Sequence, residues 1–154
     1  FNIKDNDIIN GIRKIKLRGR LEEIKSGRLK TIAGNNRLIV DGGHNISASL
    51  SIASWLKNQN QETNLIVGMM KDKEHLEFMK SFENTVNSIT LIDIPNQNSA
   101  ISKEDFENKI NKLNLNLKKS QSIESAIKSL SKNENSIILC VGSLYLVGEI
   151  LKLN

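Results

Sequence analysis

Short apolar runs alternate with longer segments of helical period along this chain, and this alternation constrains the fold more than any other feature. Four runs have the length and composition of buried strands, at 37–41 (RLIVD), 65–69 (LIVGM), 89–94 (ITLIDI) and 137–141 (IILCV). Between them, four segments space their apolar residues three and four apart, at 46–58, 73–82, 103–113 and 123–131. Each such segment can lay one face on a sheet. The pattern predicts an α/β fold, with an open, mostly parallel sheet and crossover helices.

Shorter elements flank this predicted core. The beginning of the chain has the pattern of a helix with Asp7 as its cap, and the end has the pattern of another helix. A Ser-Gly pair within an early apolar segment predicts a small hairpin, and the only proline marks a loop after the third strand. The flanking elements are a helix over 7–17, a hairpin over 21–32 turning at Ser26-Gly27, a loop over 95–99 and a helix over about 143–153.

The length of the chain suits one domain. It has 154 residues and a mass of 17.3 kDa, enough for a core of its own but short for two domains. We therefore treat residues 1–154 as a single domain. The single Cys140 excludes a disulfide framework, no apolar run is long enough to cross a bilayer, and we expect no secretory leader. These features predict a cytoplasmic protein, and because the sequence opens at Phe1 we expect it to be part of a longer polypeptide.

A surplus of cations favours an anionic partner. The formal net charge is +5 and the isoelectric point is near 9.4. Aromatic residues make up only 4% of the chain, so side chains that stack on nucleic-acid bases are scarce. A nucleotide phosphate, or a merely solvated basic face, therefore explains the charge better than a nucleic acid does. The cations crowd early in the chain, at Arg13, Lys14, Lys16, Arg18, Arg20, Lys25, Arg28 and Lys30.

Candidate ligand-binding residues follow the predicted strands, where free backbone N–H groups and helix N-termini collect in an open α/β sheet. The most informative of these segments is Asp41-Gly42-Gly43-His44-Asn45. An Asp at a strand end can accept both hydroxyls of a ribose, the glycines allow a ligand close to the backbone, and His44 can donate to a phosphate or carboxylate. The alternative is structural: Asp41 caps the helix, the glycines form a tight turn and His44 is a solvated loop residue.

The other candidate positions also have two interpretations. Lys71-Asp72-Lys73 suits an acidic substrate or a phosphate, or is a solvated loop. Ser143, after Gly142, offers a hydroxyl to a ligand or caps the next helix. Arg20 can pair with a nucleotide phosphate or stack on a base, or can form a surface salt bridge with Glu22 or Glu23.

Several familiar sites are missing from the sequence. It contains neither G-x-x-x-x-G-K-[ST] nor G-x-G-x-x-G, so it predicts no complete nucleotide site within this domain. Cys140 lies inside an apolar strand and His75 is expected to be an exposed helix residue, which leaves neither a zinc cluster nor a cysteine nucleophile. Trp55 and the Met69-Met70 pair are expected in the core or in a pocket wall.

Taken in order, four segments resemble the C-terminal domain of folylpolyglutamate synthase and its bifunctional dihydrofolate synthase relatives, in the Mur ligase superfamily. They are GRLE at 19–22, DGGHN at 41–45, GMMKDK at 68–73 and CVGSLYLVGE at 140–149. The resemblance covers nearly the whole chain, and its specificity comes from four motifs in order at the right separations. The departures are Arg18 and Ile46 in place of Pro, Gly43 in place of Ala, and Val141 within a Cys-Gly-Ser run.

The resemblance implies a three-layer, Rossmann-like α/β domain with one antiparallel strand, joined to an N-terminal P-loop ATPase domain. ATP would lie between the two domains, with Mg²⁺ ligands supplied mainly by the other domain and none by this one. The site residues that it implies are Arg20 and Asp41 for ATP, with Asp41 on the ribose, His44 as the catalytic residue, and Lys73 or Lys71 together with Ser143 for glutamate.

The activity that the resemblance implies is an ADP-forming ligation of L-glutamate to a folate or dihydropteroate carboxylate through an acyl phosphate. The isolated domain would be inactive, because its partner is its own ATPase domain. We expect a monomer with neither a nucleic-acid nor a membrane partner. The alternatives are a Mur-type cell-wall amino-acid ligase domain, a non-catalytic basic module that binds a nucleotide or nucleic acid, and an interaction domain whose DGGH turn is only structural.

Overall fold

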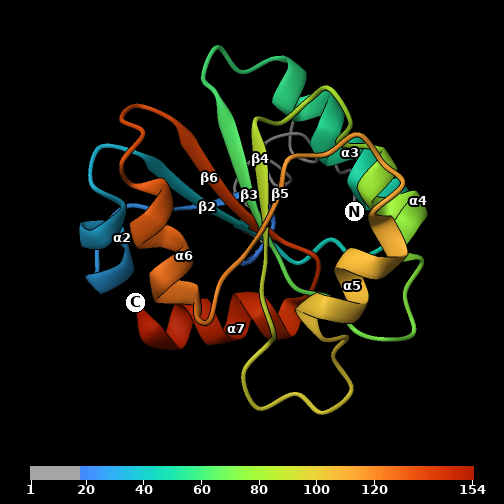
Figure 1. Cartoon of the computed structure of the whole chain (residues 1–154). Helices are drawn as coiled ribbons and strands as arrows, with labels where there is room; N and C mark the ends of the chain where they lie inside the picture. Colours follow the sequence, from blue (N-terminus) through green and yellow to red (C-terminus); the bar gives the residue numbers. More distant parts are fainter. Residues whose placement is uncertain (1–17) are drawn as a thin grey trace, which may run out of the picture.

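The computed structural model describes residues 18–154, which form a six-stranded sheet with helices on both faces (Figure 1). The predicted helix over 7–17 lies outside the described residues. The elements are β1 (Glu22–Ile24), α2 (Arg28–Ala33), β2 (Arg37–Asp41), α3 (Ile46–Lys57), β3 (Thr63–Val67), α4 (His75–Lys80), β4 (Ser88–Leu91), α5 (Lys103–Ile110), β5 (Leu117–Lys119), α6 (Ile123–Leu130), β6 (Ile137–Val141) and α7 (Leu144–Leu153).

The strand order, β1-β2-β6-β3-β4-β5, confirms the open and mostly parallel sheet. All neighbouring pairs are parallel except β1 with β2, which pair antiparallel. The chain progresses from β2 through β3 and β4 to β5, then returns so that its last strand, β6, lies between β2 and β3. In register, Val141 at the end of β6 lies beside both Asp41 at the end of β2 and Val67 at the end of β3. Three strand ends are therefore level with one another.

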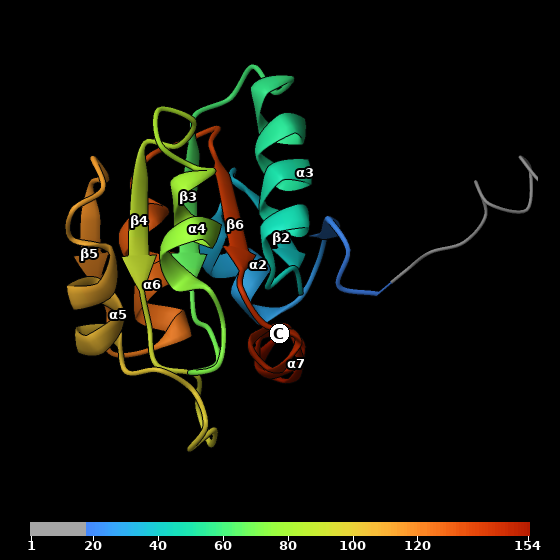
Figure 2. The same ribbon diagram turned by 90° about the vertical axis from the view of Figure 1, so that its right-hand side faces the viewer.

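Two apolar cores cover the two faces of the sheet. Figure 1 shows the sheet nearly edge-on between its two sets of helices, and Figure 2 shows it face-on with α3 and α4 in front. Successive side chains of a strand point to opposite faces, so the all-apolar strands of the centre supply both cores. Helices α3, α4 and α5 cover one face and α2, α6 and α7 cover the other. The first core includes Leu65, Leu139, Phe78, Phe82 and Phe106, and the second includes Leu38, Ile66, Ile138, Leu146 and Ile150.

The predicted strands and helices occur where the apolar pattern placed them, with small shifts. Strands 37–41 and 137–141 have the predicted bounds, whereas the strand predicted over 65–69 is Thr63–Val67. It begins earlier because Thr63 and Asn64 pair with β6, and it ends earlier because its pairing with β6 ends at Val67, opposite Val141. The predicted loop over 95–99 is confirmed.

The predicted hairpin over 21–32 is wrong. Its first part is β1, but the partner of β1 is β2, and the residues after Ser26-Gly27 form helix α2. Gly27 has a positive φ of 104° and precedes a helix whose first N–H groups are capped from far away in the sequence. Asn154 Oδ1 accepts from the N–H groups of Leu29 and Lys30 at 3.1 and 3.2 Å. A cap supplied by the end of the chain is invisible to local turn rules.

Within residues 18–154, no helix is long and apolar enough to cross a membrane.

Candidate functional site

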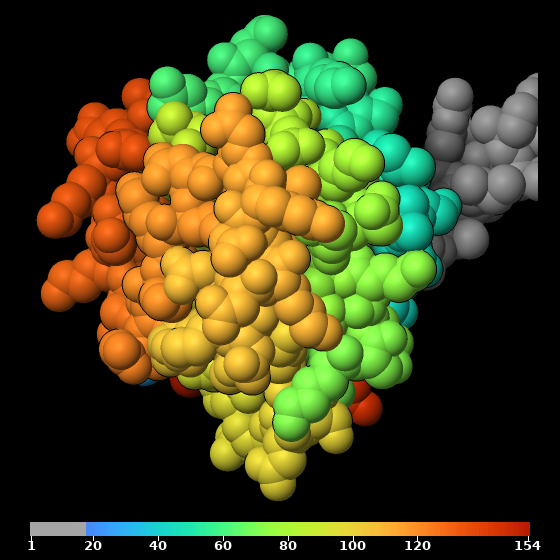
Figure 3. Space-filling model, turned by 45° about the vertical axis from the view of Figure 1, so that its right-hand side comes forward, coloured from blue at the N-terminus to red at the C-terminus, as the bar shows by residue number. Residues whose placement is uncertain are grey.

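The candidate site lies where the carboxyl ends of β2, β6 and β3 meet. The direction of the strand order reverses there, because β6, the last strand in the sequence, lies between β2 and β3. Open α/β sheets bind ligands at such a switch point. The loop after β3 is joined to the loop after β4 by an isolated bridge between Met70 and Ala100. Figure 3 shows these two loops side by side at the lower end of the molecule.

Asp41 is the structural centre of the first part of the site. It is 5% exposed, and its carboxylate accepts backbone N–H groups from two segments, Leu21 at 2.8 Å and Gly43 at 2.6 Å. The guanidinium of Arg20 lies 3.7 Å from the same carboxylate. The helix cap expected of Asp41 in the structural interpretation belongs instead to Asn45, whose side chain accepts the Ala48 N–H. Asp41 thus ties the turn before β1 to the turn after β2.

The turn before β1 is tight and strained. Gly19 and Leu21 both have positive φ, 66° and 42°, and a leucine in this region is uncommon. The Gly42 N–H donates to the Gly19 carbonyl at 2.8 Å, which closes the turn onto β2. Arg20 lies between Gly19 and Leu21 in this turn. The expected salt bridge from Arg20 to Glu22 or Glu23 is not what the structure shows, because Glu22 pairs with Arg18 and Glu23 pairs with Arg37.

His44 lies at the boundary between two cavities. Its Nδ1 is 2.9 Å from the carbonyl of Gly42, and since a carbonyl only accepts, Nδ1 carries the proton in this contact. Nε2 is then the ring nitrogen that remains for a ligand. The ring is neither buried nor fully exposed. This arrangement differs from a freely solvated loop histidine, because one backbone hydrogen bond fixes the ring.

The first cavity has a volume of about 200 Å³ and the second about 290 Å³. Both are smaller than a complete small-molecule site, which typically occupies about 300–1,000 Å³. His44 contributes to both walls. The first cavity is lined by Arg20, Leu21, Asp41, Gly43, His44, Asn45, Ala48, Ser51 and Ile52. The second is lined by His44, Met70, Asp72, Lys73, Ser143, Leu144 and Tyr145.

The two lysines of the loop after β3 differ in position. Lys73 lines the second cavity, and its ammonium lies 2.8 Å from the Asp72 carboxylate. The hydrogen bond from Lys73 lowers the pKa of Asp72 below its usual value. Lys71 instead donates from Nζ to the Asn98 carbonyl at 3.0 Å, toward the loop after β4. Of the two, only Lys73 borders the cavity that Ser143 and His44 also line.

Ser143 is a helix cap that also lines a cavity. Its hydroxyl accepts the Tyr145 N–H at 3.1 Å as the N-cap of α7, and it lines the second cavity. The preceding Gly142 has a φ of 112°, and a Cβ there would lie 2.8 Å from the Gly68 carbonyl. Only glycine allows the chain to pass so close to the loop after β3, which is how Ser143 and Lys73 come to share one cavity.

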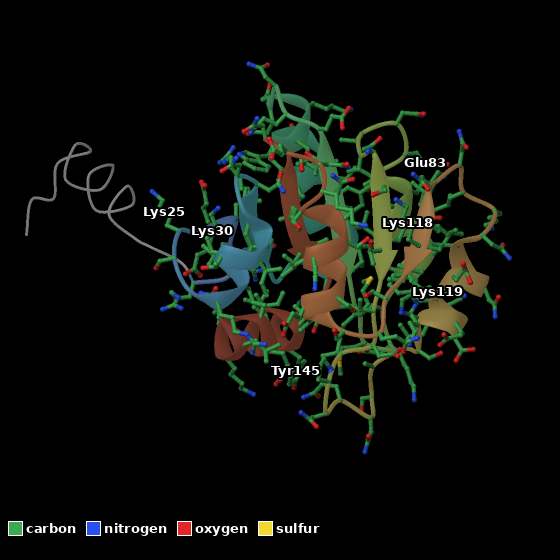
Figure 4. All side chains as sticks on the ribbon, turned by 60° about the vertical axis from the view of Figure 1, so that its left-hand side comes forward. Lys25, Lys30, Glu83, Lys118, Lys119 and Tyr145 are labelled. Carbon is green, nitrogen blue, oxygen red and sulfur yellow. The ribbon has the colours of Figure 1, made fainter. Side chains whose placement is uncertain are left out.

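Six residues of these walls had no predicted role in the site: Leu21, Ala48, Ser51, Ile52, Leu144 and Tyr145. Leu144 and Tyr145 are 51% and 55% exposed, although they begin a helix in which Leu146, Val147 and Ile150 are buried. Figure 4 shows Tyr145 at the lower end of the molecule, near the start of α7. The helical period was a signal for Tyr145, which is neither three nor four positions from the buried Leu146, Val147 and Ile150, but not for Leu144, which is three positions before Val147.

His75 corrects another expectation. It is 3% exposed rather than an exposed helix residue, because it begins α4 beneath the loop after β3. Cys140, as expected, is a buried strand residue, and burial raises the pKa of its thiol to about 12. Met69 is buried in the core, as expected, and Met70 lines the second cavity. Among residues 18–154, no group of three or more His, Cys, Asp or Glu side chains could hold a metal ion.

Known proteins of similar sequence and structure agree on one family. Residues 25–153 match the family described as dihydrofolate synthetase, C-terminal domain. The dihydrofolate synthase/folylpolyglutamate synthase of Bacillus subtilis is 24% identical over 131 residues, which cover 82% of this chain and 30% of that protein.

Two solved structures show the same fold. Mycobacterium tuberculosis folylpolyglutamate synthase, solved in complex with ADP and AMPPCP, has a TM-score of 0.81 at 15% identity. The match covers 98% of this chain and 35% of the M. tuberculosis chain. The bifunctional folylpolyglutamate synthase/dihydrofolate synthase of Yersinia pestis has a TM-score of 0.77 at 16% identity, covering 99% of this chain and 34% of its own.

The chain belongs to the dihydrofolate synthetase C-terminal domain family, which confirms the resemblance drawn from the four motifs. It spans about a third of the length of the relatives it matches.

Proposed function

We propose that this chain is the C-terminal domain of an ADP-forming ligase that joins L-glutamate to a folate or dihydropteroate carboxylate. The observation that carries the proposal is the shared position of His44. It borders a first cavity with Arg20 and Asp41 and a second cavity with Lys73 and Ser143. A ligase of this kind needs a nucleotide and an amino acid side by side, with a polar group between them.

The first cavity suits one side of a nucleotide. The Arg20 side chain is 47% exposed beside it, so its guanidinium is available to a phosphate or a base. Each Asp41 oxygen accepts one backbone N–H and has a further lone pair, which can accept a ribose hydroxyl. A volume of about 200 Å³ is too small to enclose ATP, so a second protein surface must complete the site.

That surface is, in our proposal, an N-terminal ATPase domain of the same protein. This chain covers about a third of each relative, which leaves room for such a domain in a longer polypeptide. The M. tuberculosis structure holds ADP and AMPPCP, and a Y. pestis structure holds AMPPNP and Mn. In our proposal the Mg²⁺ ligands come mainly from that other domain.

The second cavity suits the amino acid. The Lys73 ammonium can pair with a carboxylate of glutamate, and the Ser143 hydroxyl and nearby backbone N–H groups can donate to it. The Lys73 side chain is 29% exposed, so it is only partly solvated and its charge is weakened less by water than that of a surface lysine. Lys71, turned toward Asn98, is the weaker candidate.

The proposed chemistry proceeds in two steps. A carboxylate oxygen of the folate or dihydropteroate attacks the γ-phosphorus of ATP, which releases ADP and leaves an acyl phosphate. The glutamate nitrogen then attacks the acyl carbon, forming the amide and releasing phosphate and a proton. Since water would hydrolyse the acyl phosphate, closure of two domains over the substrates protects the reaction. His44 Nε2 would face the reacting phosphate and the incoming amine.

Within residues 18–154, the lysines at the two edges of the sheet do not form one basic face. Lys25 and Lys30 lie at one edge of the molecule, and Lys118 and Lys119 lie on β5 at the opposite edge (Figure 4). With the sheet between them, these four cations do not line a common groove for a polyanion.

The test is ADP release by the full-length protein, with and without glutamate and with tetrahydrofolate or dihydropteroate. We expect turnover only when both substrates accompany ATP, and a loss of about a hundredfold or more for His44→Ala, the size typical of a positioned acid–base or electrostatic group. Wild-type activity of His44→Ala would refute the site, and glutamate-independent ADP release would refute the proposed reaction. Activity with a different amino acid would instead support the Mur-type alternative.

A further inference from the structure

Two different parts of the molecule hold the two halves of the loop after β3. The first half is fastened to the loop after β4. Met70 and Ala100 form a bridge, the Lys71 N–H donates to the Ser99 carbonyl at 2.9 Å, and Lys71 Nζ donates to the Asn98 carbonyl at 3.0 Å. These contacts fix Lys71, but Lys73, which lines the second cavity, belongs to the other half.

The second half is held by a histidine. The Lys73 N–H makes a long hydrogen bond of 3.4 Å to the Met70 carbonyl, whereas His75 Nε2 lies 2.9 Å from the same oxygen. Because a carbonyl accepts and does not donate, Nε2 carries the proton in this contact. The His75 N–H also donates to the Lys73 carbonyl at 3.0 Å. One residue therefore bonds to both ends of the turn over 70–73.

The surroundings of His75 keep this donor in place. The residue is 3% exposed, and its ring meets Phe106 edge-on with the ring centroids 5.1 Å apart. Burial lowers the pKa of His75, and the hydrogen bond to Met70 only partly opposes this effect, so the ring is neutral at pH 7. Lys109 on α5 also disfavours a charged ring, whereas Asp72 favours one. Glu74 and Glu77 line the same surface hollow as His75 and Lys109.

We propose that His75 is a positioning residue for the amino-acid side of the site, where its Nε2–H fixes the turn over 70–73 and thereby sets where the Lys73 ammonium lies. This inference rests on the proposed function for its substrate. His75 lines neither of the two site cavities, so it acts through Lys73 rather than by touching the substrate. Its effect should therefore fall on the binding of the amino acid, and the nucleotide side should be spared.

The test compares two substitutions in the full-length protein. His75→Leu keeps apolar packing against Phe106 but removes the donor, whereas His75→Gln keeps an N–H donor at similar reach. We expect His75→Leu to raise the glutamate KM about tenfold, the factor that corresponds to the loss of one hydrogen bond. The ATP KM should change by less than about twofold, and His75→Gln should stay within about threefold of wild type. Glu77→Gln, on the exposed side of the same helix, is the matched control.

The pH profile provides a second readout. A histidine whose pKa is lowered in the folded state is neutral above the unfolded value near 6.5, and it gains a proton as the pH falls through the lower folded value. The added proton goes to Nδ1 and leaves the Nε2–H donor in place, so the wild-type glutamate KM should change with pH in parallel with that of His75→Gln, which does not titrate, through this range. If His75→Gln and His75→Leu are equally impaired, or if the ATP and glutamate KM values rise together, the inference is wrong.

Hydrogen exchange of this chain separates the inference from the proposed function. The backbone amides over 71–75 should exchange faster in His75→Leu than in His75→Gln, while those of β3 and β6 remain unchanged. If the wild type ligates no glutamate but this difference is present, the proposed function fails and the positioning role stands. If the amides over 71–75 exchange equally in both variants, the positioning role fails whatever the substrate.

Discussion

Replacing Asp41 should destabilise the fold as well as the site. Its carboxylate accepts the N–H groups of Leu21 at 2.8 Å and Gly43 at 2.6 Å, and the residue is only 5% exposed. A hydrogen bond to a charged group contributes about 1.5–3 kcal/mol, so Asp41→Ala should lower the free energy of unfolding by about 3–5 kcal/mol. Asp41→Asn retains one acceptor oxygen and should lower it by roughly half as much.

Urea denaturation of the chain, followed by circular dichroism, measures this difference. Asp105→Ala is a suitable control because Asp105 is exposed in the first turn of α5 and should cost no more than about 1 kcal/mol. A loss below about 1 kcal/mol for Asp41→Ala would refute the view that Asp41 ties β1 to the turn after β2. Inactivity of Asp41→Ala alone therefore cannot identify a ribose contact, because the fold is also weakened. His44 has fewer structural contacts, so a loss of activity in His44→Ala is easier to assign to the site.

Three further results follow from the contacts of single residues. Asn154→Ala should lower the free energy of unfolding by about 1–2 kcal/mol, because it removes the side-chain cap of α2. Thermal unfolding measures this loss, and an unchanged melting temperature would show that the cap contributes nothing. Gly142→Ala should lower the free energy of unfolding more than Gly34→Ala does. Both glycines have positive φ, which costs about 1 kcal/mol for each alanine, but only at Gly142 would the added Cβ meet a backbone oxygen, at 2.8 Å. Equal urea midpoints for the two variants would contradict the argument. Burial raises the pKa of the Cys140 thiol to about 12, so at pH 8 this thiol should resist alkylation in the folded chain and react in the urea-unfolded chain. Mass spectrometry would measure the labelling, and rapid labelling of the folded chain would refute the burial of Cys140.

The sequence predicted most of the fold because its central elements are specified locally. The strands over 37–41 and 137–141 are short runs of apolar residues, and the helices that follow β2 and β5 begin at Asn45 and Ser122, residues that cap helices through their own side chains. What local patterns missed depends on distant partners. The strand β5 is an edge strand with two lysines in three residues, and α2 is capped by Asn154 across the whole described chain.

The candidate site was predicted as a set of residues but not as a geometry. Motif positions placed Arg20, Asp41, His44, Lys73 and Ser143 near strand ends, and the structure gathers all five around two adjoining cavities. The sequence could not separate Lys71 from Lys73, because the difference arises from the loop after β4, whose Asn98 carbonyl binds Lys71. Nor could it show that His75 is buried, since α4 presents His75 to Phe106 of a different helix.

Most polar groups of the candidate site have a partner within this domain before any ligand binds. Asp41 is held by backbone amides of Leu21 and Gly43, His44 by the Gly42 carbonyl, and Ser143 by the Tyr145 amide. Side chains fixed in this way lose little conformational entropy when a ligand arrives. The cavities are nevertheless too small and open to exclude water, so preorganisation alone does not make them a reaction chamber. We infer that the domain contributes a rigid wall, and that the large motion of the proposed ligase is the approach of this wall to its ATPase partner rather than a rearrangement within it.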